Sequence, residues 1–198
     1  MTDFSKVSEN LKSRGFSVRC FENSAAACDY LNEVIDDKTV GIGGSATLNK
    51  LDISKSLGTH NLVLWHWKQP TVEARKMAAD AQVYLCSANA IAETGEIVNI
   101  DGYGNRVSST LFGHEKLYIV AGRNKLAPDL EKAIWRARNI AAPKRAQQFK
   151  ANTPCAVKAD RCYDCKSPER ICRGLVVLWG PAMSIETEVI LIDEDLGL

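Results

Sequence analysis

The sequence has no apolar run long enough to span a bilayer, and its first nine residues lack the basic and apolar regions of a signal peptide. We therefore expect a cytoplasmic protein without membrane insertion. The formal net charge is only +1, so no global field attracts nucleic acid. Neither a Gly-x-Ser-x-Gly elbow nor a Walker loop is present, which removes the usual sequence support for hydrolases and nucleoside triphosphatases.

Other patterns are missing as well. The three histidines, His60, His66 and His114, stand far apart without helical or paired spacing, so none is assigned a metal or catalytic role. No internal repeat or low-complexity linker divides the 198 residues, which predicts a single domain over 1–198. The only shift in composition, over residues 143–173, predicts a cysteine-bearing lobe within that domain because the segment is too short and polar for its own core.

What is present has the composition of a globular protein, with 45% apolar and 25% charged residues. Helical and strand periodicities alternate through the first 140 residues, which predicts an α/β fold with a largely parallel sheet covered on both faces. The predicted helices are 3–14, 24–35 (capped by Ser24), 45–57, 71–79 and 128–142, the last closed by Pro143. The predicted strands are 16–21, 39–42, 61–67, 83–86, 90–92, 96–100, 116–121, 175–179 and 188–192.

A glycine-rich segment, T39-V-G-I-G-G-S-A-T-L48, links a predicted strand to a predicted helix and is a candidate anion cradle. It matches a relaxed dinucleotide fingerprint, but no carboxylate follows the next strand before Glu73, so we expect no NAD. Gly43, Gly44, Ser45 and Thr47 instead suit a phosphate, a carboxylate or an acyl group. The alternative stays open: Ser45 caps a helix, and the glycines serve only the turn.

Two polar segments follow predicted strands and should meet the glycine loop at the carboxyl edge of the sheet, where ligands bind in such folds. Glu93 is a candidate catalytic nucleophile or base, and Arg106 could clamp an anion. Taken singly, a polar turn at Asp101 to Asn105 and a solvated loop carboxylate at Glu93 are the favoured interpretations, and only the convergence of these side chains supports a site. The predicted ligand-binding residues in these segments are Asn89, Glu93, Thr94, Asn99, Asp101, Asn105 and Arg106.

Four of the seven cysteines gather within 18 residues as Cys155-x6-Cys162-x2-Cys165-x6-Cys172. This spacing predicts a four-thiolate site for zinc or an iron-sulfur cluster, between which it does not decide. Unliganded thiols in a loop are the alternative. In a reducing compartment an odd number of cysteines argues against a disulfide framework, and Cys20, Cys28 and Cys86 read as small core residues.

Several motifs together resemble the lactate-utilization (LUD) domain family, in a short form that carries a cysteine loop. They are G43-G-S-A-T-L48, N89-A-I-A-E-T-G-E-I-V-N-I-D-G-Y-G-N-R106, G122-R-N-K125, A141-A-P143, T153-P-C155, C162-Y-D-C165-K-S-P-E-R-I-C172 and E194-D-L-G197. The resemblance covers nearly the whole chain. It implies a three-layer α/β/α fold like that of ribose-5-phosphate isomerase and the CoA transferases, and a link to oxidation of L-lactate to pyruvate alongside iron-sulfur partner subunits.

Three functional hypotheses remain open. The first is a component of a cytoplasmic lactate-utilization or related redox system, such as an oxidoreductase subunit. This component would bind a small anionic ligand at the glycine loop. The second is an acyl- or CoA-transferase-like or sugar-phosphate-isomerase-like enzyme that uses Glu93. The third is a non-catalytic binding or assembly module with structural zinc.

Overall fold

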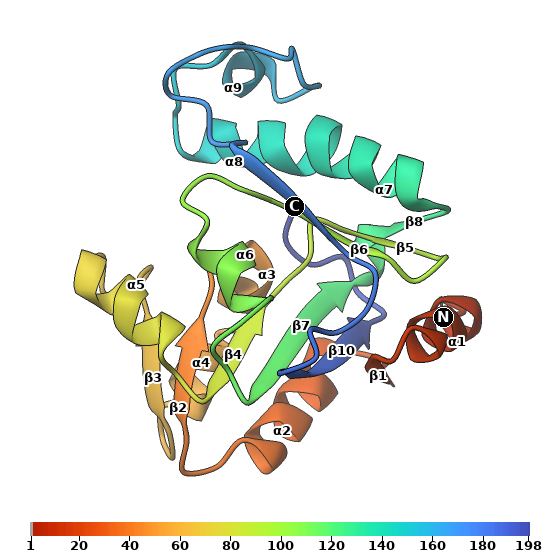
Figure 1. Cartoon of the computed structure of the whole chain (residues 1–198), viewed down its shortest axis with the longest axis vertical. Coiled ribbons are helices and arrows are strands. Elements are labelled where there is room, and N and C mark those ends of the chain that lie inside the picture. The colour runs from red at the N-terminus through yellow and green to blue at the C-terminus, as the bar shows by residue number, and fades with distance from the viewer. Residues whose placement is uncertain (1) are drawn as a thin grey trace.

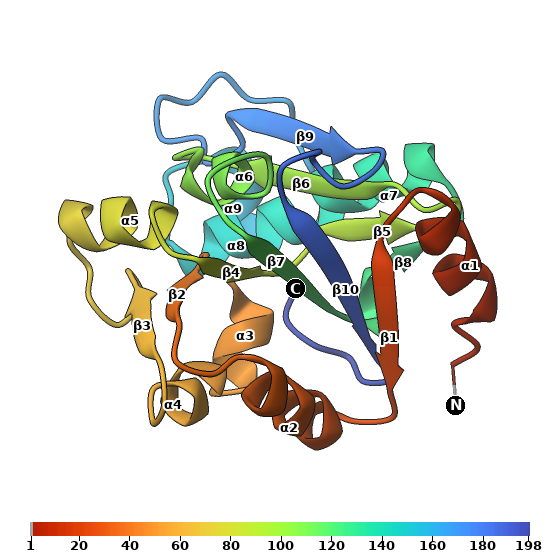
Figure 2. The same ribbon diagram turned by 60° about the horizontal axis from the view of Figure 1, so that its bottom comes forward.

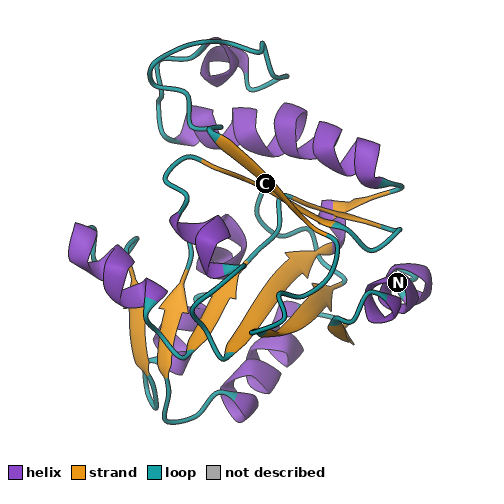
Figure 3. Cartoon of the chain, in the orientation of Figure 1, coloured by secondary structure: helices purple, strands orange, loops and turns teal. Residues whose placement is uncertain are grey.

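The computed structural model describes residues 2–198 and contains two sheets (Figures 1 and 3). The larger sheet has six strands, all parallel, in the order β1-β10-β7-β4-β2-β3. Their bounds are β1 (Ser17–Phe21), β2 (Thr39–Ile42), β3 (Leu62–Trp65), β4 (Val83–Cys86), β7 (Lys116–Gly122) and β10 (Glu186–Ile192). The prediction of an α/β fold with a mostly parallel sheet flanked by helices is confirmed.

A second sheet of four short strands lies over one face of the first, in the order β8-β5-β6-β9. Its strands are β5 (Ala90–Ala92), β6 (Ile97–Asp101), β8 (Leu126–Ala127) and β9 (Gly174–Leu178). The strand near 175 was predicted, but its place in a separate sheet was not. β9 pairs antiparallel with β6. Of the last two strands only β10 joins the main sheet, where it lies between β1 and β7.

The helices cover both sheets in layers, as Figure 2 shows. Leu31 of α2 and Leu48 of α3 pack in one core on one face of the main sheet, and α1 packs with the second sheet in another core on the opposite face. The long helical segment α7-η2-α8 covers the outer side of the second sheet. The helices are α1 (Ser5–Ser13), α2 (Ser24–Val34), α3 (Ala46–Lys50), α4 (Ile53–Leu57), α5 (Val72–Ala79), α6 (Asn105–Ser109), η1 (Arg123–Lys125), α7 (Leu130–Arg136), η2 (Ala137–Ala141), α8 (Ala142–Gln148) and α9 (Pro154–Lys158).

Pro143 does not end its helix, contrary to the prediction. The segment Ala137–Ala141 is a π-helix, and the chain continues beyond it through α8 to Gln148. Proline lacks an N–H donor, and its ring crowds the carbonyl four residues earlier in a regular helix. A wider π turn just before Pro143 relieves both problems, so the helix passes through the proline.

Three further predictions about local structure were wrong. The predicted helix 45–57 divides into α3 and α4 because Asp52 adopts a left-handed conformation (φ 48) between them. Asn23, not Ser24, caps α2: its side chain accepts a hydrogen bond from the Ala26 N–H at 3.0 Å. Cys20 is exposed on β1, the edge strand of the main sheet, and is therefore no core residue.

Candidate functional site

Two adjoining cavities, of about 410 and 100 Å³, lie beyond the carboxyl ends of β2 and β4. We call them together the crevice. The main sheet contributes the glycine loop, and α8 together with residues 168–173 forms the facing wall. The two cavities share six lining residues, which are Gly44, Trp67, Ile100, Arg106, Arg145 and Ile171. The crevice thus occupies the edge at which ligands bind in open parallel sheets.

The hydroxyl groups of the glycine loop are already engaged within the protein. Ser45 Oγ accepts a hydrogen bond from Leu48 N at 3.1 Å and so caps α3. Thr47 Oγ1 donates to the carbonyl of Leu196 at 3.3 Å and accepts from Ser87 Oγ at 3.2 Å. Of the two roles that the sequence left open for Ser45, the cap is therefore the one that its side chain performs here.

Close packing explains Gly43 and Gly44, since neither has a positive φ. A Cβ on Gly43 would lie 2.9 Å from the hydroxyl oxygen of Tyr84 and 3.0 Å from Cγ of Arg106, and one on Gly44 would lie 3.0 Å from Nε1 of Trp67. Real Cβ atoms are rarely this close to other side chains. Gly43 therefore lets Tyr84 and Arg106 lie against the loop, and Gly44 does the same for Trp67. The turn hypothesis did not include this close packing.

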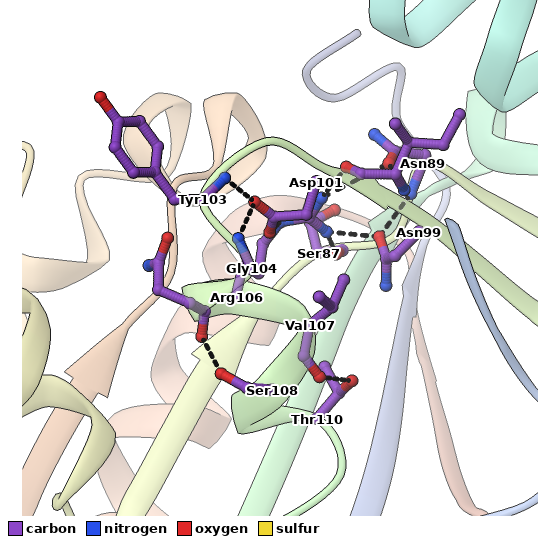
Figure 4. Close-up of polar contacts among 12 residues, drawn as sticks. Ser87, Asn89, Asn99, Asp101, Tyr103, Gly104, Arg106, Val107, Ser108 and Thr110 are labelled. Carbon is purple, nitrogen blue, oxygen red and sulfur yellow. Dashed lines mark hydrogen bonds and ion pairs between the residues drawn. The ribbon is translucent and has the colours of Figure 1, made fainter. Parts of the chain in front are cut away.

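Arg106 is the centre of a buried polar network (Figure 4). Its guanidinium donates to the carbonyl oxygens of Ser87 at 3.2 Å and Ile100 at 2.7 Å, and to Oδ1 of Asn99. Asp101 lies 3.6 Å from its Nε as an ion-pair partner. Most donors of this arginine are used inside the protein, so it shapes the crevice wall more than it offers free hydrogen bonds.

The predicted amide side chains belong to the same network. Asn89 Oδ1 accepts from Ile100 N at 2.6 Å, and Asn99 Oδ1 accepts from Asn89 N at 3.1 Å. Asp101 Oδ1 accepts from Gly104 N at 3.0 Å and thereby holds the turn before α6. Asn89, Asp101 and Asn105 line the crevice, whereas Asn99 is buried behind it.

Two cations to which the sequence assigned no site role line the crevice: Lys125 of η1 and Arg145 of α8. A third, Arg136 of α7, lies behind it and donates to the main-chain oxygens of Asn89 and Leu198, two lining residues. Arg145 stacks over Trp67 and Phe149, with its guanidinium carbon 4.3 and 3.9 Å from the ring centroids. Within residues 2–198, none of these three cations forms an ion pair with an Asp or Glu side chain. Lysine and arginine side chains thus outnumber the two acidic side chains, Asp101 and Glu169, that line the crevice.

Lys125 shows the effect of this charge. Burial first, and then repulsion from Arg136, Lys144 and Arg106, lower the pKa of Lys125 to about 7. Its ammonium group and Nη2 of Arg136 both donate to the main-chain oxygen of Leu198, the last residue of the sequence. An oxygen atom thus already lies between the two cations. The only sequence signal for Lys125 was its place in the G122-R-N-K125 motif, which indicates a family and no role.

His66 also lines the crevice, although its sequence position suggested no function. Its side chain is buried, and Nδ1 has no hydrogen-bond partner in the described part of the chain. Burial, helped by Arg75 and Arg145 and opposed by Asp101, lowers the pKa of His66 below its usual value. A neutral imidazole with a free nitrogen is therefore present beside the cations at neutral pH.

Glu93 and Thr94 do not lie beside the glycine loop. They belong to the turn between β5 and β6, where the Glu93 carboxylate pairs with Lys6 of α1 at 2.8 Å. Neither residue lines the crevice. The strands turn this hairpin toward α1, so a carboxylate that follows β5 in sequence is carried away from the carboxyl edge of the main sheet. A catalytic role for Glu93 stays a prediction without support from this geometry.

Glu93→Gln should leave folding and ligand binding almost unchanged. The pair that it breaks is surface-exposed, so the free energy of unfolding should fall by no more than about 1 kcal/mol. Thermal denaturation and anion titration of the variant check this expectation. A loss of turnover in any acyl-transfer assay, with folding intact, would restore Glu93 as a candidate catalytic residue.

The comparison with protein families now identifies the relationship. The LUD domain matches residues 4–192, almost the whole chain. The protein belongs to the LUD domain family. A solved structure of a DUF162 family protein from Deinococcus radiodurans is similar over 97% of this chain and 99% of that chain, with a TM-score of 0.53 and 13% sequence identity. At that identity the likeness supports the fold alone. No functionally curated protein shows a significant match.

In this LUD domain all seven cysteines are free thiols. Cys155, Cys162, Cys165 and Cys172 line one small cavity beside α8. As the side chains stand, no group of three or more His, Cys, Asp or Glu residues among residues 2–198 is arranged to hold a metal ion. The metal site therefore remains a prediction, now with the four thiols around a common space.

The LUD domain also lacks, within residues 2–198, any helix long and apolar enough to cross a membrane.

Proposed function

We propose that this LUD domain binds a small anionic ligand in the crevice and serves as a component of a lactate-utilization or related redox system. The observation that carries the proposal is that Lys125 and Arg145 line the crevice with Arg136 close by, and that none of the three pairs with an Asp or Glu side chain within residues 2–198. Membership of the LUD family supports the link to lactate through the family's name only. The binding of an anion is the part that follows from charge and geometry.

The electrostatic argument favours an anion with oxygen acceptors. Burial and neighbouring cations lower the pKa of Lys125 toward neutrality, so an anion near it would favour the charged ammonium form. Guanidinium groups match the paired oxygens of a carboxylate or phosphate. Two cavities of about 410 and 100 Å³ exceed the size of lactate, so a phosphorylated or acyl-bearing anion is a second candidate ligand.

Arg106 and His66 would have different roles at the bound ligand. Arg106 is held by backbone carbonyls and Asp101, so it provides a fixed positive potential at the wall. The neutral imidazole of His66 could accept a proton from a hydroxyl group of the ligand. Oxidation of L-lactate to pyruvate breaks an O–H and a C–H bond and releases two protons and two electrons. His66 would take the hydroxyl proton, the proton from the C–H bond would pass to solvent, and we assign the two electrons to iron-sulfur partner subunits.

Isothermal titration with L-lactate, pyruvate, inorganic phosphate and coenzyme A tests the proposal. The site variant is Arg145→Met, which keeps an apolar chain between Trp67 and Phe149 but removes the charge. Arg19→Met is the matched control, because Arg19 also stacks on an aromatic ring, Tyr30, but lies on β1 outside the crevice. We expect at least one anion to bind the wild type and the control, and to bind Arg145→Met about tenfold more weakly.

Equal binding by the Arg145→Met variant would contradict the crevice as the binding site. A preference for L-lactate or pyruvate would support the lactate-utilization role. A preference for phosphate or coenzyme A would favour the second candidate ligand.

Sulfate binding should weaken as the pH rises through about 7. The charge of sulfate is constant over this range, whereas Lys125 loses its proton near its lowered pKa of about 7. Lys125 is mostly protonated and attracts sulfate below this pKa, and it loses that charge as the pH rises above it. We expect about a tenfold decrease in affinity between pH 6 and pH 9, measured by titration calorimetry, and a flatter profile in Lys125→Met. An unchanged affinity over this range would contradict the role of Lys125.

A further inference from the structure

We propose that Cys155, Cys162, Cys165 and Cys172 bind a single zinc ion, and that this ion orders the wall of the crevice formed by residues 168–173. The zinc site stands on the cysteines alone. Any effect of the ordered wall on ligand binding depends on the anion-binding function proposed above.

The first argument is the shared cavity. Cys155 lies on α9, Cys162 and Cys165 lie in the loop after it, and Cys172 lies two residues before β9. All four line one space of about 10 Å³. That volume is close to the space that one water-sized sphere needs. As the side chains stand they do not yet surround an ion, so binding would require the sulfur atoms to turn toward this space. Zinc prefers four thiolates in a tetrahedral arrangement, and the four side chains supply that number.

The second argument is the set of donors that surrounds the sulfur atoms. Arg170 Nη2 lies 3.4 Å from Sγ of Cys172, and Arg138 Nη2 lies 3.8 Å from Sγ of Cys162. The backbone N–H of Asp164 also donates to Cys162 Sγ at 3.3 Å. One zinc ion with four thiolates is doubly negative, and two guanidinium groups would offset this charge. Neutral thiols have no comparable need for such partners.

The third argument is that little else holds this part of the chain. Residues 159–173 contain no helix or strand, and no residue from 157 to 177 is buried. A segment of this kind has no hydrophobic core that could fix its conformation. Binding of zinc to four thiolates can supply that free energy directly. Figure 1 shows the segment looping out beside α9, above α8.

The cysteine cavity and the crevice have a wall in common. Arg170 and Ile171 line both, and Pro168, Glu169 and Arg173 line the crevice. Cys165 and Cys172 lie on either side of these wall residues in the sequence. Fixing the two sulfur atoms on one ion would therefore fix the residues between them, and loss of the ion would loosen the wall.

Metal analysis of the full chain tests the zinc site. Protein purified without oxygen and dialysed against zinc should hold one zinc ion per chain, and replacement by cobalt should give the visible absorption of tetrahedral cobalt–thiolate coordination. The variant Cys162→Ser with Cys165→Ser should lose the ion, whereas the control Cys20→Ser with Cys28→Ser should keep it. Less than half an ion per chain, retention by the first variant, or iron with acid-labile sulfide would each overturn the proposal.

Hydrogen exchange tests the ordered wall independently of any ligand. Amides of residues 165–173 should exchange about tenfold faster after a chelator removes zinc, and zinc should restore their protection. Exchange in β7 and β10 should not change, which controls for unfolding. Equal exchange with and without zinc would overturn the wall's dependence on the ion. A zinc-loaded protein that binds none of the tested anions would instead contradict the proposed function and leave the zinc site standing.

Discussion

Replacing Arg106 by methionine should lower the free energy of unfolding by about 3–5 kcal/mol and abolish anion binding. The side chain is buried and donates to the carbonyls of Ser87 and Ile100 and to Asn99. Methionine fills part of the same volume but leaves these acceptors without donors and the Asp101 carboxylate without its cation. Urea denaturation measures the loss of stability, and sulfate titration measures the loss of binding.

A double variant separates the two sources of this loss. If the unpaired Asp101 carboxylate is a large part of the cost, Arg106→Met with Asp101→Asn should be more stable than Arg106→Met alone. Arg19→Met is again the control, because Arg19 is mostly exposed and its partner Glu188 keeps contacts with Tyr30 and Lys116. We expect a change within about 1 kcal/mol for that control. A similarly small change for Arg106→Met would contradict the central place of Arg106.

Replacing Lys125 by methionine should have effects of opposite sign on stability and on binding. The lysine is buried among cations, so its charged form destabilises the folded state, whereas methionine carries no charge. We expect the variant to be more stable than the wild type by roughly 1–4 kcal/mol, and to bind sulfate at least about tenfold more weakly.

The pH dependence fixes the sign of this prediction. The pKa of Lys125 is about 7 in the folded protein, against an ordinary value of 10.5. The unfolded chain therefore binds more protons than the folded one between these values, and the penalty in the folded state is fully present below pH 7. The advantage of Lys125→Met should be largest at pH 6 and shrink toward pH 10. Lys132→Met, at an exposed position on α7, is the matched control. A variant that is less stable than the wild type at pH 6 would contradict this account.

The sequence predicted most secondary-structure elements because their periodicities are local. The strands at 83–86 and 116–121 and the helix at 71–79 lie where the apolar spacing places them. The exceptions have local causes that apolar spacing does not express. A π-helix passes the chain through Pro143, and a left-handed Asp52 divides one predicted helix into two.

The candidate site was predicted in part. Arg106, Asn89, Asn99 and Asp101 meet in one network because they follow strands whose ends come together. Glu93 shares that sequence context, yet the β5–β6 hairpin turns it toward Lys6. His66 was given no role because it has no paired spacing with another histidine. Its lowered pKa comes from burial and from Arg75 and Arg145, and its burial and the nearby Arg145 follow only from the fold.

The sequence by itself determined the α/β class, the family and the four-cysteine spacing, since each depends on residue order within short segments. Only the tertiary structure decided where the positive charge gathers. Lys125, Arg136 and Arg145 lie on three different elements, and their proximity follows from the packing of α7-η2-α8 over the second sheet. The structure likewise showed that Gly43 and Gly44 are needed for close approach by Arg106 and Trp67, because such contacts join residues that are remote along the chain.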